Sequence, residues 1–338
     1  MYLRKLVNSV LIFLSFVVFS SCQGDNTDDN IVNPPESTNN RWEQVASFGG
    51  RAVGGAASFT IGTNAYVVSG NTGNQLLNQV YQYNSSANTW AVKSNFPGSY
   101  RLDCNGFTIG GKGYVCLGSD NRIMLSDIWE YDPQNDTWSR KADFPGGARL
   151  LATAIVINQK AYIIAGSTSY PSGQQNDVWE YDPQTDQWTQ KNDFPGVARS
   201  SAVGFTIGNK GYVGTGIIAA EGYTTAKDFW EYDQPTDTWT RKVDLPGIAR
   251  GYAQAFAIGN KGYIALGMND INSSGTVLTL TKDIWEFDPQ SNAWTEKTIF
   301  PGSGRAMAVS FVIDSFAYIG LGNRENVSTL NDFWKFRP

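Results

Sequence analysis

The sequence predicts an all-β fold in which one four-stranded unit occurs six times. The 338-residue chain contains 35 glycines, is 13% aromatic and only 17% charged, a composition typical of short strands joined by turns rather than of helices. A tryptophan recurs about every fifty residues, at Trp42, Trp90, Trp138, Trp188, Trp239 and Trp294. An arginine stands eleven residues after five of these tryptophans, at Arg101, Arg149, Arg199, Arg250 and Arg305.

Each copy divides into four strands in the same order. In the fourth copy the first strand is expected within residues 201–208 (SAVGFTIG) and the second within 210–216 (KGYVGTG), with a tight turn between them. The third strand reads DVWEYD in the third copy, and the fourth carries the recurrent tryptophan. The turn between these two is rich in Asp, Pro and Gln, where proline sets φ and aspartate caps the backbone. Four-stranded units at this period are the signature of β-propeller blades, so a six-bladed β-propeller is expected.

The two chain ends are expected to share one blade. The sixth copy stops at Pro338, before the turn and the tryptophan that complete the other copies. The segment NRWEQVASF, which contains Trp42, can supply the missing fourth strand. Pairing the first strand with the last closes the ring and leaves no blade with a bare edge. The predicted blades span residues 51–92, 101–140, 149–190, 199–241, 250–296 and 305–338, with 41–47 as the last strand of the sixth.

The variation in repeat length is confined to the connection between the second and third strands. The first strand of each copy begins on the face where this connection lies, so the loops and the arginines share one face, called here the loop face. Insertions confined to one face of a repeat protein mark its binding face. Tyrosines among mixed charges suit contact with a carbohydrate or a peptide. The candidate contacts are Asp120, Arg122, Tyr170, Glu221, Tyr223, Asp270, Arg324 and Glu325, with Tyr100 and Tyr252 beside the arginines.

The repeated arginines allow two interpretations. Six guanidinium groups around the mouth of a central channel would attract a carboxylate and could hold it bidentately. Alternatively, each arginine pairs with an aspartate of its own blade and only stabilises the fold. Arg51 differs from the others, because its blade has Gln79 where the other blades have aspartate. The arginines are Arg51, Arg101, Arg149, Arg199, Arg250 and Arg305, and the aspartates are Asp127, Asp177, Asp228, Asp283 and Asp332.

The repeat resembles the kelch repeat. A tyrosine stands seven residues before the tryptophan in four copies, as Tyr83 does before Trp90, and a phenylalanine takes that place in the fifth copy. In addition, a glycine ends the second strand and an arginine opens each copy. The resemblance covers residues 41–338, although a single glycine replaces the double glycine usual in the family. It implies a six-bladed propeller similar in architecture to the bacterial kelch-type N-acetylneuraminate epimerases, which interconvert sialic acid anomers. The galactose-oxidase relatives bind copper through histidines, and this chain has no histidine.

The first residues predict a lipoprotein signal peptide, 1–21, followed by a flexible acidic tether, 22–40. A basic start precedes an apolar run from Leu6 to Phe19, which is short for a membrane span. The end of this run resembles a bacterial lipobox, which implies lipidation of Cys22; an ordinary signal peptide with an unmodified cysteine is the alternative. The tether lacks the apolar residues that a core needs and resembles the export signal of Bacteroidetes surface lipoproteins. An outer-membrane lipoprotein at the cell surface is expected, with a periplasm-facing one as the alternative.

Cys104 and Cys116 lie on the first and second strands of the second copy, across a tight turn. Neighbouring strands could bring the two sulfur atoms within bonding distance, and export would permit oxidation. Two buried free thiols are the alternative.

Composition excludes several function classes and leaves two. A net charge of −5 argues against binding to nucleic acid. The absence of histidine removes histidine-based triads and imidazole metal sites, and no metal or cofactor is expected. The first hypothesis is a monomeric binding module that presents its loop face to a glycan, an acidic sugar or a protein partner and touches the membrane only through the lipid on Cys22. The second is an epimerase or mutarotase of the sialic-acid type, for which the sequence singles out no catalytic residue.

Overall fold

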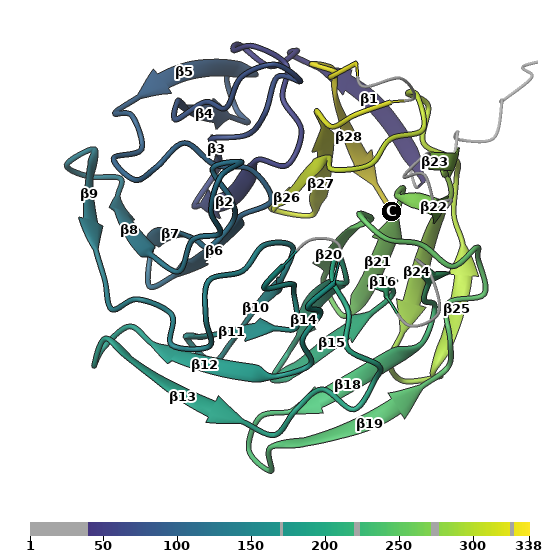
Figure 1. Cartoon of the computed structure of the whole chain (residues 1–338). Helices are drawn as coiled ribbons and strands as arrows, with labels where there is room; N and C mark the ends of the chain where they lie inside the picture. The colour runs from purple at the N-terminus through teal and green to yellow at the C-terminus, as the bar shows by residue number, and fades with distance from the viewer. Residues whose placement is uncertain (1–39, 170–171, 220–223, 272–276, 325–327) are drawn as a thin grey trace, which may run out of the picture. The chain divides into compact units, whose positions relative to one another are not determined.

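The computed structural model describes residues 40–169, 172–219, 224–271, 277–324 and 328–338, which lie in one compact unit, Thr38–Pro338. All regular elements in this part of the chain are strands; they form six four-stranded antiparallel sheets arranged around a central axis (Figure 1) and two small two-stranded hairpins. No helix of the described residues has the length and apolar character that a membrane crossing needs. The predicted all-β, six-bladed propeller is confirmed.

The first three blades each contain four consecutive strands that pair in sequence order. Blade 1 consists of β2 (Ala57–Ile61), β3 (Asn64–Val68), β4 (Val80–Asn84) and β5 (Thr89–Lys93). Blade 2 consists of β6 (Asn105–Ile109), β7 (Lys112–Cys116), β8 (Ile128–Asp132) and β9 (Thr137–Arg140). Blade 3 consists of β10 (Thr153–Ile157), β11 (Lys160–Ile164), β12 (Val178–Asp182) and β13 (Gln187–Lys191).

Blades 4 and 5 add a small hairpin to the same plan. Blade 4 consists of β14 (Val203–Ile207), β15 (Lys210–Gly214), β18 (Phe229–Asp233) and β19 (Thr238–Lys242), and its loop carries β16 (Ile217–Ile218) and β17 (Thr224–Thr225). Blade 5 consists of β20 (Gln254–Ile258), β21 (Lys261–Ala265), β24 (Ile284–Asp288) and β25 (Ala293–Glu296), and its loop carries β22 (Met268–Ile271) and β23 (Val277–Leu280). The hairpins occupy the second-to-third strand connections, where the sequence showed its longest insertions.

The sixth blade joins the two ends of the described chain. It contains β26 (Val309–Ile313), β27 (Phe316–Gly320), β28 (Phe333–Arg337) and, as its outer strand, β1 (Arg41–Val45). Trp42 pairs with Phe336 across the β1–β28 ladder. The indole of Trp42 also packs on the rings of Phe336 and Phe300, at centroid distances of 4.8 and 5.0 Å. The predicted closure of the ring by an N-terminal strand is therefore confirmed.

Apolar layers between neighbouring blades form the core. Each layer combines side chains of two adjacent blades; Phe59 and Tyr66 of blade 1, for example, pack with Val115 and Tyr131 of blade 2. Between blades 6 and 1, Phe311 and Tyr318 join the same kind of layer. Burial of this apolar area is the main force that holds the blades side by side.

The turns between the third and fourth strands also link neighbouring blades. Asp136 lies in such a turn with a φ of 53° and accepts a hydrogen bond from the Tyr131 hydroxyl at 2.6 Å. The same carboxylate accepts the backbone N–H of Ser94, in the preceding blade, at 3.2 Å. The repeated turn aspartate and the repeated tyrosine therefore have a structural role.

Candidate functional site

Five of the six repeated arginines form buried ion pairs with the aspartate of their own blade. Their side chains are at most 1% exposed. Arg101 represents the set: its two terminal nitrogens donate to the two carboxylate oxygens of Asp127 at 2.9 and 2.7 Å, and Nη1 also donates to the carbonyl of Leu117 at 2.9 Å. The other pairs are Arg149–Asp177, Arg199–Asp228, Arg250–Asp283 and Arg305–Asp332.

The electrostatic properties of these ion pairs are those expected of groups that stabilise the fold. Burial alone would raise the pKa of the Asp127 carboxyl, but the hydrogen bonds and charge of Arg101 outweigh it and hold the pKa below its ordinary value. The guanidinium also lies over the ring of Phe96, at 4.7 Å. None of the five arginines lines the central channel. The structure therefore gives them the stabilising role that the sequence left as an alternative, and their charges do not circle the channel mouth.

Arg51 differs from the other five, as the sequence predicted. Its side chain is exposed, and Nη1 donates to the side-chain carbonyl of Gln75 at 2.8 Å. Gln79, which replaces the aspartate, accepts the Tyr81 hydroxyl instead. Arg51 therefore keeps a guanidinium that solvent can reach.

The predicted loop residues are only partly described. Asp120 caps its own turn by accepting the backbone N–H groups of Arg122 and Ile123, both at 2.8 Å. Arg324 donates to the Ser328 hydroxyl, and Tyr100 is 54% exposed. Asp270 belongs to β22. The remaining predicted residues lie outside the described part of the chain: Cys22, Tyr170, Glu221, Tyr223 and Glu325.

The two cysteines of blade 2 are free thiols in the structure. Cys104 is half-buried and Cys116 is buried. Burial raises the pKa of the Cys104 thiol to about 12 and also raises that of Cys116. Both sulfurs are therefore protonated and unreactive at neutral pH, which agrees with the second alternative drawn from the sequence.

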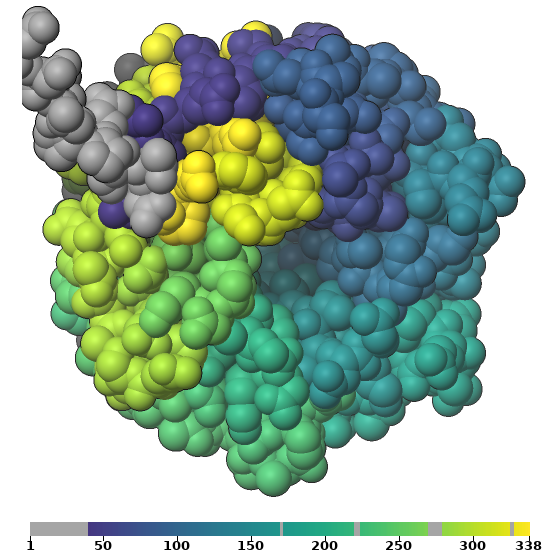
Figure 2. All heavy atoms as spheres, turned by 180° about the vertical axis from the view of Figure 1, so that it is seen from behind, coloured from purple at the N-terminus to yellow at the C-terminus, as the bar shows by residue number. Residues whose placement is uncertain are grey.

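One of the cavities is a channel along the propeller axis. Figure 2 shows a hollow at the centre of the ring. The cavity has a volume of about 250 Å³ and is lined by the first strands of all six blades and by the residues just before them. A second cavity of about 370 Å³ is lined by residues farther along the same strands, including Thr108, Val156 and Thr206.

One residue from each blade forms a ring, called here the inner ring, at the entrance of the channel on the loop face. Each member adopts a left-handed backbone conformation, with φ between 52° and 65°. In five members the backbone N–H donates to the carbonyl of the member in the preceding blade; Asp103 donates in this way to Gly55 at 2.8 Å, and Gly55 donates to Met307 at 3.0 Å. The inner ring consists of Gly55, Asp103, Leu151, Ser201, Tyr252 and Met307.

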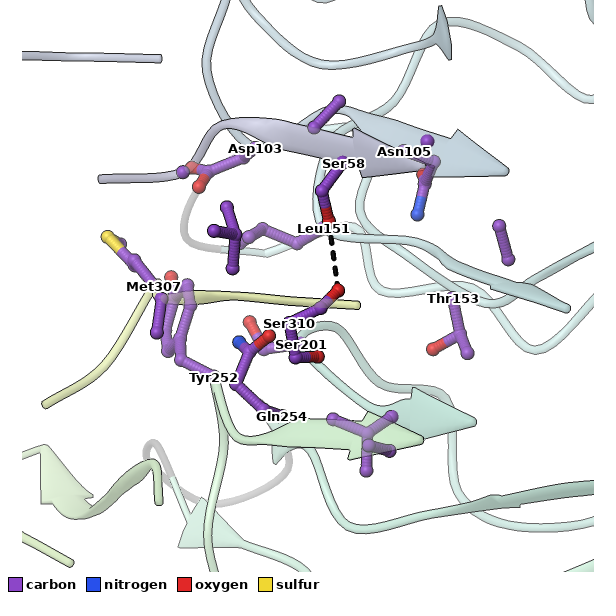
Figure 3. A pocket seen from close by; sticks show the side chains of 18 of the residues that line it. Ser58, Asp103, Asn105, Leu151, Thr153, Ser201, Tyr252, Gln254, Met307 and Ser310 are labelled. Atoms are coloured by element: carbon purple, nitrogen blue, oxygen red, sulfur yellow. Dashed lines mark hydrogen bonds between the residues drawn. The ribbon is translucent and has the colours of Figure 1, made fainter. Parts of the chain in front are cut away.

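The side chains of the inner ring differ in every blade, although their backbone is the same. Figure 3 shows Asp103, Leu151, Tyr252 and Met307 at one end of the channel. Asp103 is the only charged residue among the described residues that line the cavity. Burial raises the pKa of its carboxyl to about 7. The carboxylate lies so close to Gly55 that a methyl group on Gly55 would be 2.7 Å from Oδ1.

Farther into the channel, the N–H and O–H groups of the polar side chains donate hydrogen bonds to backbone carbonyls. Asn105 Nδ2 donates to the carbonyl of Ala152 at 2.8 Å, and the Ser58 hydroxyl donates to Ser310 at 3.1 Å (Figure 3). Asn105 Oδ1 and Ser201 Oγ are buried and have no hydrogen-bond partner among the described residues. A buried polar atom without a partner is costly, so these atoms mark a place where a ligand or water is expected.

Sequence reasoning found one member of the inner ring, Tyr252, and missed the others. In five blades the member stands two residues after the repeated arginine, as Asp103 does after Arg101. Alignment of the copies on that arginine would have shown a variable position inside a repeated segment.

Part of this chain is similar in sequence to a curated enzyme. The N-acetylneuraminate epimerase of Yersinia enterocolitica serotype O:8 / biotype 1B is 29% identical over 76 residues, which are 22% of this chain and 19% of that enzyme. The chain thus matches about a fifth of the length of this curated relative.

The fold has a counterpart among solved structures. The structure of YjhT superposes with a TM-score of 0.72 at 16% identity, over 86% of this chain and 96% of the other. At this identity the likeness concerns the fold. Residues 151–338, more than half of the chain, match the family described as the KLHDC2/KLHL20/DRC7 Kelch-repeats domain. With its repeated blades and this match, the chain belongs to the kelch-repeat family.

Proposed function

We propose that this propeller is a binding module that takes up its ligand at the loop-face entrance of the central channel. The observation that carries the proposal is the inner ring, in which six equivalent backbone positions hold six different side chains. The five buried arginine pairs, in contrast, repeat from blade to blade. Variation at one place inside a repeated frame is expected where the side chains serve recognition rather than folding.

The backbone conformation of the inner ring supports this proposal. The left-handed region costs an L-residue roughly 1–2 kcal/mol, and glycine avoids that cost. Only blade 1 has glycine in the ring; Leu151, Tyr252 and Met307 have large side chains at the same conformation. Residues held in a sparsely populated backbone region cluster at functional sites.

Surface anchorage is the second part of the proposal. Cys22 would carry the lipid, and residues 22–40 would form the tether that holds a monomeric propeller away from an outer membrane. The support comes from the lipobox-like residues before Cys22 and the acidic composition that follows. A glycan or a protein at the cell surface would then be the partner, with the exposed Arg51 close to the loop face as an additional contact.

The proposal can be tested with a glycan array and with surface proteins of neighbouring cells. We expect any ligand found to bind at least about tenfold more weakly to Tyr252→Asn, because asparagine tolerates the left-handed backbone but removes the aromatic contact. Val92→Asn is the matched control, since Val92 lies on β5 and is 66% exposed. A ligand whose affinity is equal in both variants and in the unmodified protein would place binding away from the inner ring and contradict the proposal.

An enzyme that interconverts sialic acid anomers is a second candidate. Two observations favour it: the partial match to an N-acetylneuraminate epimerase, and the pKa of about 7 of Asp103, which suits a general acid or base at neutral pH. Anomer exchange of N-acetylneuraminate, followed by NMR, tests this candidate directly. Exchange that the protein accelerates and that Asp103→Asn abolishes would favour the enzyme over the module.

A further inference from the structure

We infer that the inner ring selects a primary alkylammonium group, which Asp103 holds as its counter-ion. The inference rests on the proposed function, because it names the chemical class of ligand that the same entrance would accept. Three features of the site carry it: an excess of hydrogen-bond acceptors, an unpaired carboxyl group, and apolar side chains beside that group.

The channel entrance offers acceptors and few donors. Asn105 Nδ2, Gln254 Nε2 and the Thr153 hydroxyl all donate to backbone carbonyls, at 2.8, 3.0 and 2.8 Å. The Ser58 hydroxyl does the same. Asn105 Oδ1 remains without a partner. An ammonium group has three donors and no acceptor, so it complements such a lining.

The carboxyl group of Asp103 has no counter-ion within the described part of the chain. No ion pair or hydrogen bond to its oxygens occurs among the described residues, and none of the residues lining the cavity is lysine or arginine. The nearby guanidinium of Arg101, two residues earlier, is held by Asp127. Cys104, which follows Asp103, is a neutral thiol because burial raises its pKa to about 12, and the phenol of Tyr252 also lines the entrance. A partly buried carboxylate without a partner favours a cation as its ligand.

The apolar members of the inner ring suit an alkyl chain next to the ammonium group. Leu151, Tyr252 and Met307 line the same entrance as Asp103 (Figure 3). Methylene groups can pack against the leucine and methionine side chains, and an aromatic face attracts a cation. Ser201, only 6% exposed, adds a hydroxyl oxygen that has no partner in the part of the chain that the structure describes.

The same features disfavour an anionic ligand at this entrance. A sugar carboxylate would meet the ionised Asp103 with no buried cation beside it, and like charges at short range repel strongly in a low-dielectric site. The acidic sugar considered from the sequence therefore suits the exposed Arg51 better than the inner ring.

The experiment uses the methyl groups of methionine as reporters in the full-length chain. The sequence has four methionines; Met307 lies in the inner ring, and Met124 lies in the loop of blade 2. With carbon-13 labels on the methyl groups, n-butylammonium is expected to shift the Met307 signal and to leave the Met124 signal in place. n-Butanol, a neutral probe of similar shape, is expected to shift neither at the same concentration.

Asp103→Asn is the test variant, because asparagine has the same shape and accepts the left-handed backbone. We expect its affinity for n-butylammonium to fall at least about tenfold, as the loss of a charge-assisted contact implies. Asp193→Asn, the same change at an exposed aspartate, should have no effect. In the unmodified protein the affinity should rise roughly tenfold between pH 6 and pH 8, because the carboxyl becomes ionised over that range.

The outcomes separate this inference from the proposed function. Equal affinity of n-butylammonium for Asp103→Asn and the unmodified protein, or no shift of Met307 at any pH, would overturn the inference. If glucosamine binds and n-butylammonium does not, the ammonium group is recognised only on a sugar, and the alkyl part of the inference is wrong. If a neutral glycan shifts Met307 while both amines fail, the binding module stands and its ligand is not cationic.

Discussion

Arg101 donates from both terminal nitrogens to both carboxylate oxygens of Asp127, at 2.9 and 2.7 Å, and its side chain has no exposed surface. The same pair recurs in four further blades. A charge that is buried and fully engaged in this way holds the start of the first strand against the start of the third. It is thereby unavailable to a ligand.

Removal of one partner of this pair should destabilise the propeller strongly. Asp127→Asn leaves the Arg101 guanidinium buried without a counter-ion, so we expect a loss of about 3–5 kcal/mol in the free energy of unfolding, measured in urea. The control is Asp143→Asn, whose partner Arg140 is exposed; that pair should contribute less than about 1 kcal/mol. Equal losses in the two variants would contradict a structural role for the buried pair.

The stability of the protein should fall at acidic pH. The pKa values of Asp127, Asp228, Asp283 and Asp332 are lowered in the folded state, where arginine pairing outweighs the effect of burial. Their contribution is present at neutral pH and is lost progressively as the pH falls below about 4, where the unfolded chain binds protons that the folded carboxylates take up only at lower pH. Urea midpoints measured from pH 7 down to pH 3 should decrease steadily over the last unit, and constant midpoints would argue against this pairing.

Asp103 should have the opposite effect on stability. Its pKa is raised to about 7 by burial, so the folded state binds the proton more tightly than the unfolded state, and stability decreases as the pH rises from about 4 to about 7. Asp103→Asn removes this pH-dependent contribution to the free energy of unfolding. The variant should match the unmodified protein near pH 4 and exceed it by on the order of 4 kcal/mol at pH 8. A variant that is less stable than the unmodified protein at pH 8 would show that the ionised carboxylate has a partner.

Gly55 lies close to the carboxylate of Asp103, so a substitution of Gly55 can test the proposed binding site without removing the charge of Asp103. In Gly55→Ala the new methyl group would lie 2.7 Å from Asp103 Oδ1, so the carboxylate must move. We expect ligand affinity to decrease several-fold. Gly62→Ala is the matched control, because Gly62 has a similar φ of 59° and no atom within 4 Å of the added methyl. Both variants should lose about 1 kcal/mol of stability from backbone strain, and only Gly55→Ala should lose affinity.

Deletion of residues 41–47 should open the ring. The deletion removes β1 and the Trp42 indole that packs on Phe300 and Phe336, and it exposes β28 as an unpaired edge. A sharp decrease in Tm with aggregation is expected, measured by calorimetry and light scattering. Deletion of residues 24–37, in the predicted tether, should leave the Tm unchanged. An unchanged Tm after removal of 41–47 would contradict closure by β1.

The sequence by itself determined the repeat, the strand order, the closure of the sixth blade and the distinct character of Arg51. These features depend on spacing along the chain and on local turn chemistry, which a single sequence displays directly. The sequence also aligned five of the six arginines with an aspartate of the same blade, and it showed both roles that such an arginine could have.

Only the tertiary structure decided which role the arginines have and brought together the residues of the proposed binding site. Whether a guanidinium meets a carboxylate or a ligand depends on side-chain direction and burial, which spacing does not determine. The inner ring joins residues about fifty positions apart, such as Asp103 and Leu151, through hydrogen bonds between blades. Those residues become neighbours only when the ring closes, because each blade contributes a single member and the site exists only between them.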